Sequence, residues 1–131
     1  ITGVQLEAGT AASDFEFLPY SVNLQRCFRY YYKKISTDPY GPLAQGMQIG
    51  GTDCMIQGYH PIKMRSSPSL AITGTWSVES GTTNATFSLS GNRTNLFGWS
   101  NQQAITATDG SAAIIYAGND STASFSGDAE L

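Results

Sequence analysis

The stretch Leu70-Ala71-Ile72-Thr73-Gly74-Thr75-Trp76-Ser77-Val78 has an apolar residue or a glycine at every second position. Side chains of a β-strand point alternately to the two faces of its sheet, so this period of two predicts one strand, residues 70–78, with a single buried face. Trp76 shares that face and is expected to anchor the core. Pro68, just before the stretch, marks a boundary because proline interrupts strand pairing.

Short runs of the same kind occupy most of the chain on both sides of this strand. Turn-forming residues separate them, as in Gly91-Asn92, Asp109-Gly110 and residues 118–120. Regularly spaced short strands with such turns predict an all-β fold, an antiparallel β-sandwich or jelly-roll-like domain. The further strands expected are residues 28–35, 47–50, 54–59, 62–64, 86–89, 95–99, 104–107, 112–117 and 123–126.

One segment departs from the strand pattern. Val22, Leu24, Cys27 and Phe28 recur at spacings compatible with one or two helical turns, which predicts one short helix near residues 20–28. Cys27 stands among apolar residues, so its thiol is expected to be buried and free. A disulfide bridge from Cys27 to Cys54 is left open as the alternative.

The chain is organised as one domain. Its 131 residues suffice for a single core and are too few for two well-packed ones. Residues 1–18 are expected to be extended, and residues 19–131 to form the compact domain. The chain begins inside an expected strand and without a methionine, which suggests that it belongs to a longer protein.

Composition argues against several kinds of partner and site. Charged residues make up only 13% of the chain and the net charge is −3, whereas nucleic-acid binding depends on clustered lysine and arginine. No apolar run is long enough to span a bilayer, so no membrane insertion is expected. Cys27 and Cys54 are the only cysteines, too few for a disulfide scaffold or a zinc site.

Catalytic patterns are also missing from the sequence. Hydrolysis of a polysaccharide needs two carboxylates that flank the bond, but most acidic residues here belong to turn sequences such as Asp109-Gly110. His60 is the only histidine and has no second histidine or cysteine close by in the sequence. We therefore predict a protein that is not an enzyme, with no catalytic residues, no metal and no cofactor.

A longer pattern covers about the first quarter of the chain. It combines a Val-Gln-Leu-Glu run (Val4–Glu7), a Phe-Glu pair (Phe15-Glu16), a Pro-Tyr turn (Pro19-Tyr20), a leucine (Leu24), a cysteine (Cys27) and an Arg-Tyr-Tyr run (Arg29–Tyr31). This pattern resembles the segment by which many bacteriophage and prophage tail fibres begin their C-terminal domain. Residues 61–68 and the final Ala129-Glu130-Leu131 are similar to the same family.

The resemblance implies a trimeric, β-rich tip domain of a virion tail fibre that attaches to the host cell. Its partners would be a host surface glycan or another outer-surface receptor, two further copies of the chain, and upstream fibre modules. Residues 1–18 would then form a neck shared with the upstream module. Two alternatives remain open: a structural cap for trimerisation and folding, and a depolymerase that acts on a surface polysaccharide.

Candidate ligand-binding residues follow from the chemistry of sugars. A sugar has apolar C–H faces rimmed by hydroxyls, which suit an aromatic ring surrounded by planar amide and guanidinium groups. One short span offers this combination: Arg93, Asn95, Trp99, Asn101, Gln102 and Gln103. Tyr40, in a loop rich in proline and glycine, is a second exposed-aromatic candidate. The competing interpretation is that Trp99 closes the core beside Leu96 and Phe97.

Overall fold

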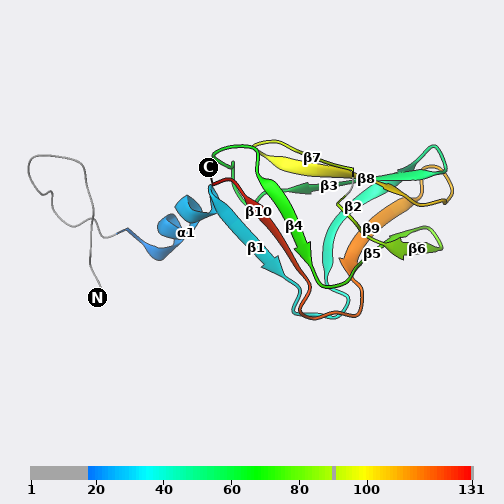
Figure 1. The fold of residues 1–131 in the computed structure, drawn as a ribbon, viewed down its shortest axis with the longest axis horizontal. Coiled ribbons are helices and arrows are strands. Elements are labelled where there is room, and N and C mark those ends of the chain that lie inside the picture. The colour runs from blue at the N-terminus through cyan, green and yellow to red at the C-terminus, as the bar shows by residue number, and fades with distance from the viewer. Residues whose placement is uncertain (1–17, 90, 131) are drawn as a thin grey trace, which may run out of the picture.

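The computed structural model describes residues 18–89 and 91–130, and these residues form mostly antiparallel β-structure with one helix (Figure 1). The prediction of an all-β fold with a short helix near residues 20–28 is confirmed. The predicted neck segment, residues 1–18, lies outside the described residues except for Leu18.

The strands belong to two antiparallel sheets. The small sheet has the order β1-β10-β4, and the large sheet has the order β6-β5-β9-β2-β3-β8-β7. The elements along the chain are α1 (Tyr20–Phe28), β1 (Tyr31–Ile35), β2 (Pro42–Ile49), β3 (Asp53–Tyr59), β4 (Ser69–Thr73), β5 (Trp76–Ser80), β6 (Thr83–Thr86), β7 (Asn92–Thr94), β8 (Gly98–Ala104), β9 (Ala112–Ala117) and β10 (Ser124–Asp128).

The stretch that was expected to be one strand, residues 70–78, is divided between the two sheets. Gly74 has φ +74°, a left-handed conformation that ends β4 in the small sheet and lets the chain turn into β5 of the large sheet. Asp120 holds this turn, since its Oδ2 accepts a hydrogen bond of 2.9 Å from the Thr75 amide. The prediction of a single strand was wrong, although Trp76 is buried as expected.

The core draws side chains from both sheets. Phe125 of β10 lies against Trp99 of β8, with the two ring centroids 4.9 Å apart. Trp76 of β5 and Ile115 of β9 are also almost completely buried. Packing of these large apolar groups supplies most of the favourable free energy of such a fold.

Four more expected strands differ from the structure. Residues 95–97 form the turn between β7 and β8, residues 62–64 lie in an irregular segment, residues 105–107 follow the end of β8, and residues 87–89 follow the end of β6. In each case turn or loop contacts replace the pairing that a strand requires. By contrast, the expected strand at residues 112–117 coincides with β9.

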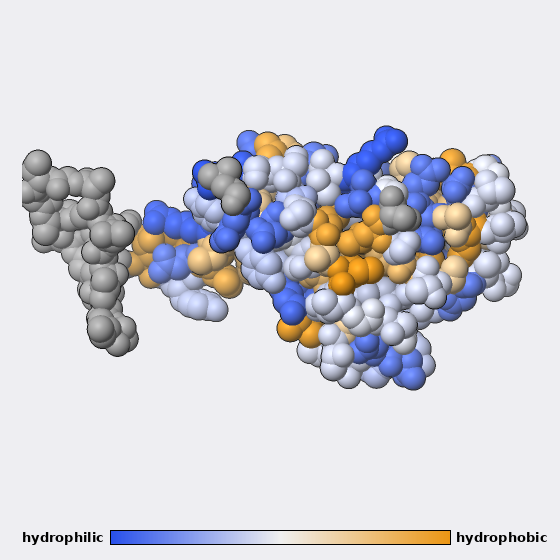
Figure 2. Space-filling model, viewed as in Figure 1, coloured by the Kyte–Doolittle hydropathy of each residue, from blue (hydrophilic) through white to orange (hydrophobic). Residues whose placement is uncertain are grey.

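The helix α1 projects away from the sheets (Figure 1) and none of its residues is buried. Cys27 is exposed on it, so the prediction of a buried thiol was wrong, because no sheet covers this part of the helix. Cys54 is buried in β3, and both cysteines are free. Figure 2 shows apolar atoms on the surface of α1 beside polar ones.

Candidate functional site

Trp99, the centre of the predicted ligand-binding span, belongs to the core. Its side chain is only 5% exposed, and its ring packs against Phe125 and lies across Gly58. Trp99 is therefore a core residue, as in the competing interpretation, although Phe97, which that interpretation placed beside it, is exposed. The prediction of an exposed sugar platform at Trp99 was wrong. Its inward orientation follows from the register of β8 on β3, which places Trp99 opposite Gly58.

The amides of the same span divide between the inside and the outside of the sheet. Asn101 is completely buried, and its Nδ2 donates a hydrogen bond of 3.0 Å to the Ser88 carbonyl, so it cannot meet a ligand at the surface. Gln103 is half-buried and its Oε1 accepts a hydrogen bond from the Ser88 amide. Gln102 is exposed on the outer face, opposite Met55 of β3. Of these three amides, only that of Gln102 is on an exposed residue.

A hollow of about 350 Å³ lies on the outer side of the large sheet, where β3, β8 and β7 run side by side. Three predicted site residues line it, namely Arg93, Asn95 and Trp99. Further residues that line it include Gln57, Tyr59, Thr94, Phe97 and Ser100. Tyr40, the second candidate, lies elsewhere, and its ring centroid is 6.3 Å from that of Tyr116.

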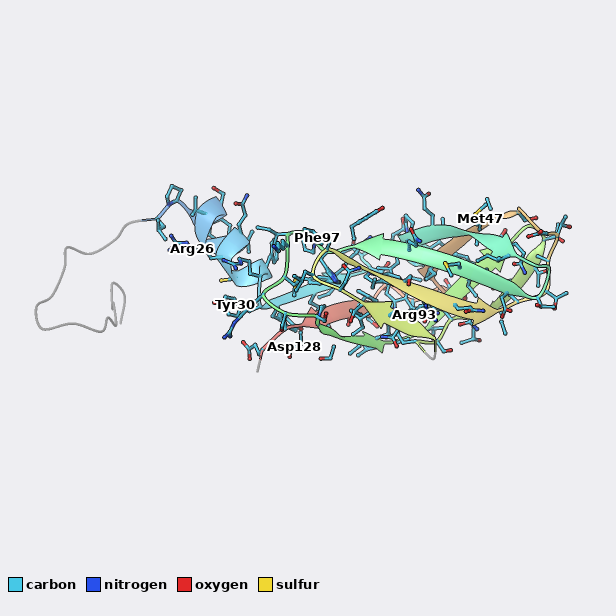
Figure 3. All side chains as sticks on the ribbon, turned by 90° about the horizontal axis from the view of Figure 1, so that it is seen from above. Arg26, Tyr30, Met47, Arg93, Phe97 and Asp128 are labelled. Atoms are coloured by element: carbon cyan, nitrogen blue, oxygen red, sulfur yellow. The ribbon has the colours of Figure 1, made fainter. Side chains whose placement is uncertain are left out.

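Two aromatic side chains at this hollow are unusually exposed. Tyr59, the last residue of β3, is 83% exposed, and Phe97, in the turn between β7 and β8, is 60% exposed. Phe97 lies at the end of the sheets near α1, with Arg93 further along the sheet (Figure 3). Neither aromatic was predicted as a site residue, because an aromatic residue in a strand run is normally core. The asparagine and glycine that flank Phe97 were the available turn signal.

Asn95 shapes the turn that presents Phe97. Its Oδ1 accepts hydrogen bonds from the Phe97 amide at 2.8 Å and from the Gly98 amide at 3.0 Å. The Asn95 amide in turn donates to the Gly98 carbonyl at 3.0 Å. An asparagine side chain that binds nearby backbone amides stabilises such a turn. Asn95 therefore positions the aromatic ring, with its side-chain oxygen already occupied.

The turn is also bound to the segment that follows Tyr59. The His60 amide donates to the Phe97 carbonyl at 3.0 Å, and the Met64 amide donates to the Leu96 carbonyl at 2.8 Å. His60 Nε2 lies 3.0 Å from the Asn95 carbonyl. These bonds fix the position of the Phe97 turn relative to Tyr59, the residue before His60.

His60 is buried and links this region to the small sheet. The Asn95 carbonyl can only accept, so Nε2 carries the proton, and Nδ1 accepts from the Tyr32 hydroxyl at 3.0 Å. Burial lowers the pKa of His60, which keeps the imidazole neutral. Burial also raises the pKa of Tyr32 to about 12. The pair is therefore an uncharged structural link between β1 and the hollow.

The ionisable groups around the hollow are basic. Arg93 is exposed and lines it, and Lys63 Nζ lies 5.4 Å from the centroid of the Phe97 ring. The residues that line the hollow include no aspartate or glutamate. In the part of the chain that the structure describes, no three His, Cys, Asp or Glu side chains gather as they would around a metal ion.

Comparison of the chain with protein-family models, with curated proteins and with solved structures returned no match. Among residues 18–89 and 91–130, no helix is both long and apolar enough to cross a membrane. Two aromatic rings, an arginine and the amide of Gln57 surround one hollow, a combination that suits a polar ligand with apolar faces.

Proposed function

We propose that this domain is the tip of a bacteriophage-type tail fibre and attaches the virion to its host by binding a surface glycan in the hollow between Tyr59 and Phe97. One observation carries the proposal: two exposed aromatic rings flank a hollow lined by guanidinium and amide groups. Sugar C–H faces would stack on the rings, and sugar hydroxyls would bind Arg93 and Gln57.

The hydrogen bonds beneath the hollow favour binding over chance exposure of the rings. Exposed aromatic side chains normally lose entropy when a ligand orders them, which weakens binding. Here the loop that bears Phe97 is held by its own asparagine and by the His60 segment. The ligand would therefore meet a preformed surface and would pay a smaller ordering cost.

The fibre identity rests on the resemblance of residues 4–31, with support from residues 61–68 and 129–131. On this proposal residues 1–18 form the neck toward upstream modules, and the domain acts at the virion's outer end. We interpret the two sheets, which share one core, as the predicted β-sandwich. No enzymatic step is proposed, because the residues that line the hollow lack the pair of carboxylates that glycoside hydrolysis uses.

The proposal is tested by glycan-array binding and by host adsorption of fibres that carry Tyr59→Ala or Phe97→Ala. Both side chains are mostly exposed, so we expect thermal stability to stay nearly unchanged while glycan binding and adsorption fall. Tyr40→Ala is the matched control, since Tyr40 is an exposed tyrosine, 62% accessible, away from the hollow. Unchanged binding and adsorption in both hollow variants would refute the proposal.

A second role, trimerisation, is favoured by the exposed apolar groups. None of the nine residues of α1 is buried, and an isolated helix of this length is only marginally stable in water. On β2, Met47 and Ile49 are exposed as well. We therefore propose that three copies associate and cover α1.

Light scattering tests the trimer, with Leu24→Glu as the disrupting variant and Lys33→Gln as a surface control. We expect the unsubstituted chain and the control to associate and Leu24→Glu to be monomeric. A monomer at every concentration of the unsubstituted chain would count against this role, and would leave the binding proposal untouched.

A further inference from the structure

Basic side chains gather around the hollow in a chain that is acidic overall. The sequence has seven lysine and arginine residues against ten aspartate and glutamate residues. Arg93 lines the hollow, and Lys63 stands over the Phe97 ring at its margin. An even distribution would place acidic groups here at least as often as basic ones.

A second hollow, of about 380 Å³, adjoins the first and has the same charge pattern. The two share Gln57, Gly58 and Tyr59, so the exposed Tyr59 ring stands between them. Lys34 lines the second hollow, with its Nζ donating to the Pro42 carbonyl at 2.8 Å. No aspartate or glutamate lines either hollow. The positive groups therefore extend along a path on both sides of Tyr59.

Arg93 is the cation best placed to bind a ligand. Across residues 18–89 and 91–130, no carboxylate occupies its guanidinium. Lys34 and Lys63 are each already engaged, by a carbonyl and by a ring respectively. A guanidinium presents a planar fork of donors that matches carboxylate and phosphate oxygens in a bidentate arrangement.

We propose that the hollow binds an acidic saccharide, whose carboxylate or phosphate group pairs with Arg93 while its sugar rings stack on Tyr59 and Phe97. Lys63, whose Nζ lies over the Phe97 ring, adds a second positive charge. This inference rests on the proposed glycan-binding function and specifies the chemical class of its ligand. A neutral sugar would still stack on the rings and offer its hydroxyls to Arg93 and Gln57, but it would leave the guanidinium without an anion.

The inference is tested with the unsubstituted chain on a printed array of bacterial saccharides. Each acidic member is accompanied by its own neutral counterpart, carboxyl-reduced for a uronic acid or dephosphorylated for a phosphosugar. We expect the bound members to be acidic and each neutral counterpart to bind about tenfold more weakly, because charged hydrogen bonds are the stronger ones. The two kinds of counterpart show whether carboxylate or phosphate supplies the anion.

Variants assign this preference to a residue. Arg93→Gln should remove most of the difference between acidic and neutral members and keep the stacking affinity, because Lys63 supplies only a secondary charge. Lys33→Gln removes one positive charge from an exposed position on β1 and should keep the preference. Affinity for acidic members should also fall as salt rises from low to high concentration, since exposed charges are screened.

The outcomes separate this inference from the proposed function. Equal binding of acidic and neutral members, with both lost in Tyr59→Ala, overturns the acidic specificity and leaves glycan binding in place. A preference that survives Arg93→Gln undiminished also overturns the inference. No binding on the array, together with normal host adsorption by Tyr59→Ala fibres, overturns the proposed function itself.

Discussion

Replacing Gly58 by alanine should destabilise the domain, because the Trp99 indole lies directly against the Gly58 backbone. A Cβ at Gly58 would lie 2.5 to 2.6 Å from Cε2, Cζ2 and Nε1 of the Trp99 indole. Such distances are far below van der Waals contact. The indole is held from its other side by the Phe125 ring, with centroids 4.9 Å apart, so it cannot simply move away.

The expected cost follows from this overpacking. Extra methyl groups forced into a packed core typically cost about 1–3 kcal/mol. For a domain of this size that corresponds to a decrease in melting temperature of roughly 4–15 °C. The free energy of unfolding should be measured by urea denaturation followed by far-UV circular dichroism. The slope of that free energy against urea concentration should be the same in the variant and the parent.

A double-mutant cycle identifies Trp99 as the cause. Leucine at position 99 lacks all three indole atoms that the new methyl would strike. In a Trp99→Leu background the added cost of Gly58→Ala should fall below about 0.5 kcal/mol, although Trp99→Leu itself is costly. Gly50→Ala is the control, because a Cβ at Gly50 would have no atom within 4 Å. Gly50 has φ +65°, so alanine there has its own backbone cost, and that cost should simply add to the cost of Trp99→Leu.

Two results would refute this reasoning. One is a Gly58→Ala variant as stable as the parent. The other is a double variant in which the two costs add within about 0.5 kcal/mol, since that would mean that the methyl and the indole do not meet.

Three further predictions concern the network beneath the hollow. Burial lowers the pKa of His60 below its ordinary 6.5, so the unfolded chain takes up a proton first as pH falls, and the free energy of unfolding declines below about pH 6.5. In urea titrations at several pH values, His60→Gln should flatten this decline. An unchanged dependence of the unfolding free energy on pH would contradict the prediction. The pKa of Tyr32 is raised from 10 to about 12, so the stability that its protonated hydroxyl contributes is complete below pH 10 and is lost as pH rises toward 12. In thermal melts, Tyr32→Phe should lack this loss of stability between pH 10 and 12. The same alkaline profile in the variant and the parent would argue against the prediction. Asn95→Ala removes the oxygen that accepts hydrogen bonds from the Phe97 and Gly98 amides, so it should lower stability by roughly 1–2 kcal/mol and weaken glycan binding. Asn95→Asp keeps that acceptor and should retain both stability and binding. Equal losses in the two variants would rule out the positioning role.

Local sequence patterns determined the fold class and several elements. Residues 112–117, which show a period of two, all lie in one strand, β9. Val22, Leu24 and Phe28, which show helical spacing, all lie in α1. Turn residues between short runs indicated an antiparallel all-β chain. These features depend on neighbours within a few residues, so the sequence alone carries them.

The candidate site was only partly predictable. Arg93 and Asn95 were identified by residue type, and both line the hollow. Tyr59 and Phe97 were missed, because an aromatic side chain in an apolar run has the same local pattern whether it is core or exposed. Phe97 is exposed because Asn95 and the His60 segment hold its turn outward, and His60 lies 35 residues before Asn95 in the chain.

The tertiary structure alone decided which faces are covered. Alternation shows that Leu70, Ile72, Trp76 and Val78 can share a face, but it cannot show that Gly74 sends the two halves to different sheets. It likewise leaves Trp99 equally suited to a surface platform and to the core. Phe125, 26 residues further along, settles that choice by packing on its ring. A period of two fixes only relative orientation, and burial depends on the segment that packs on each face.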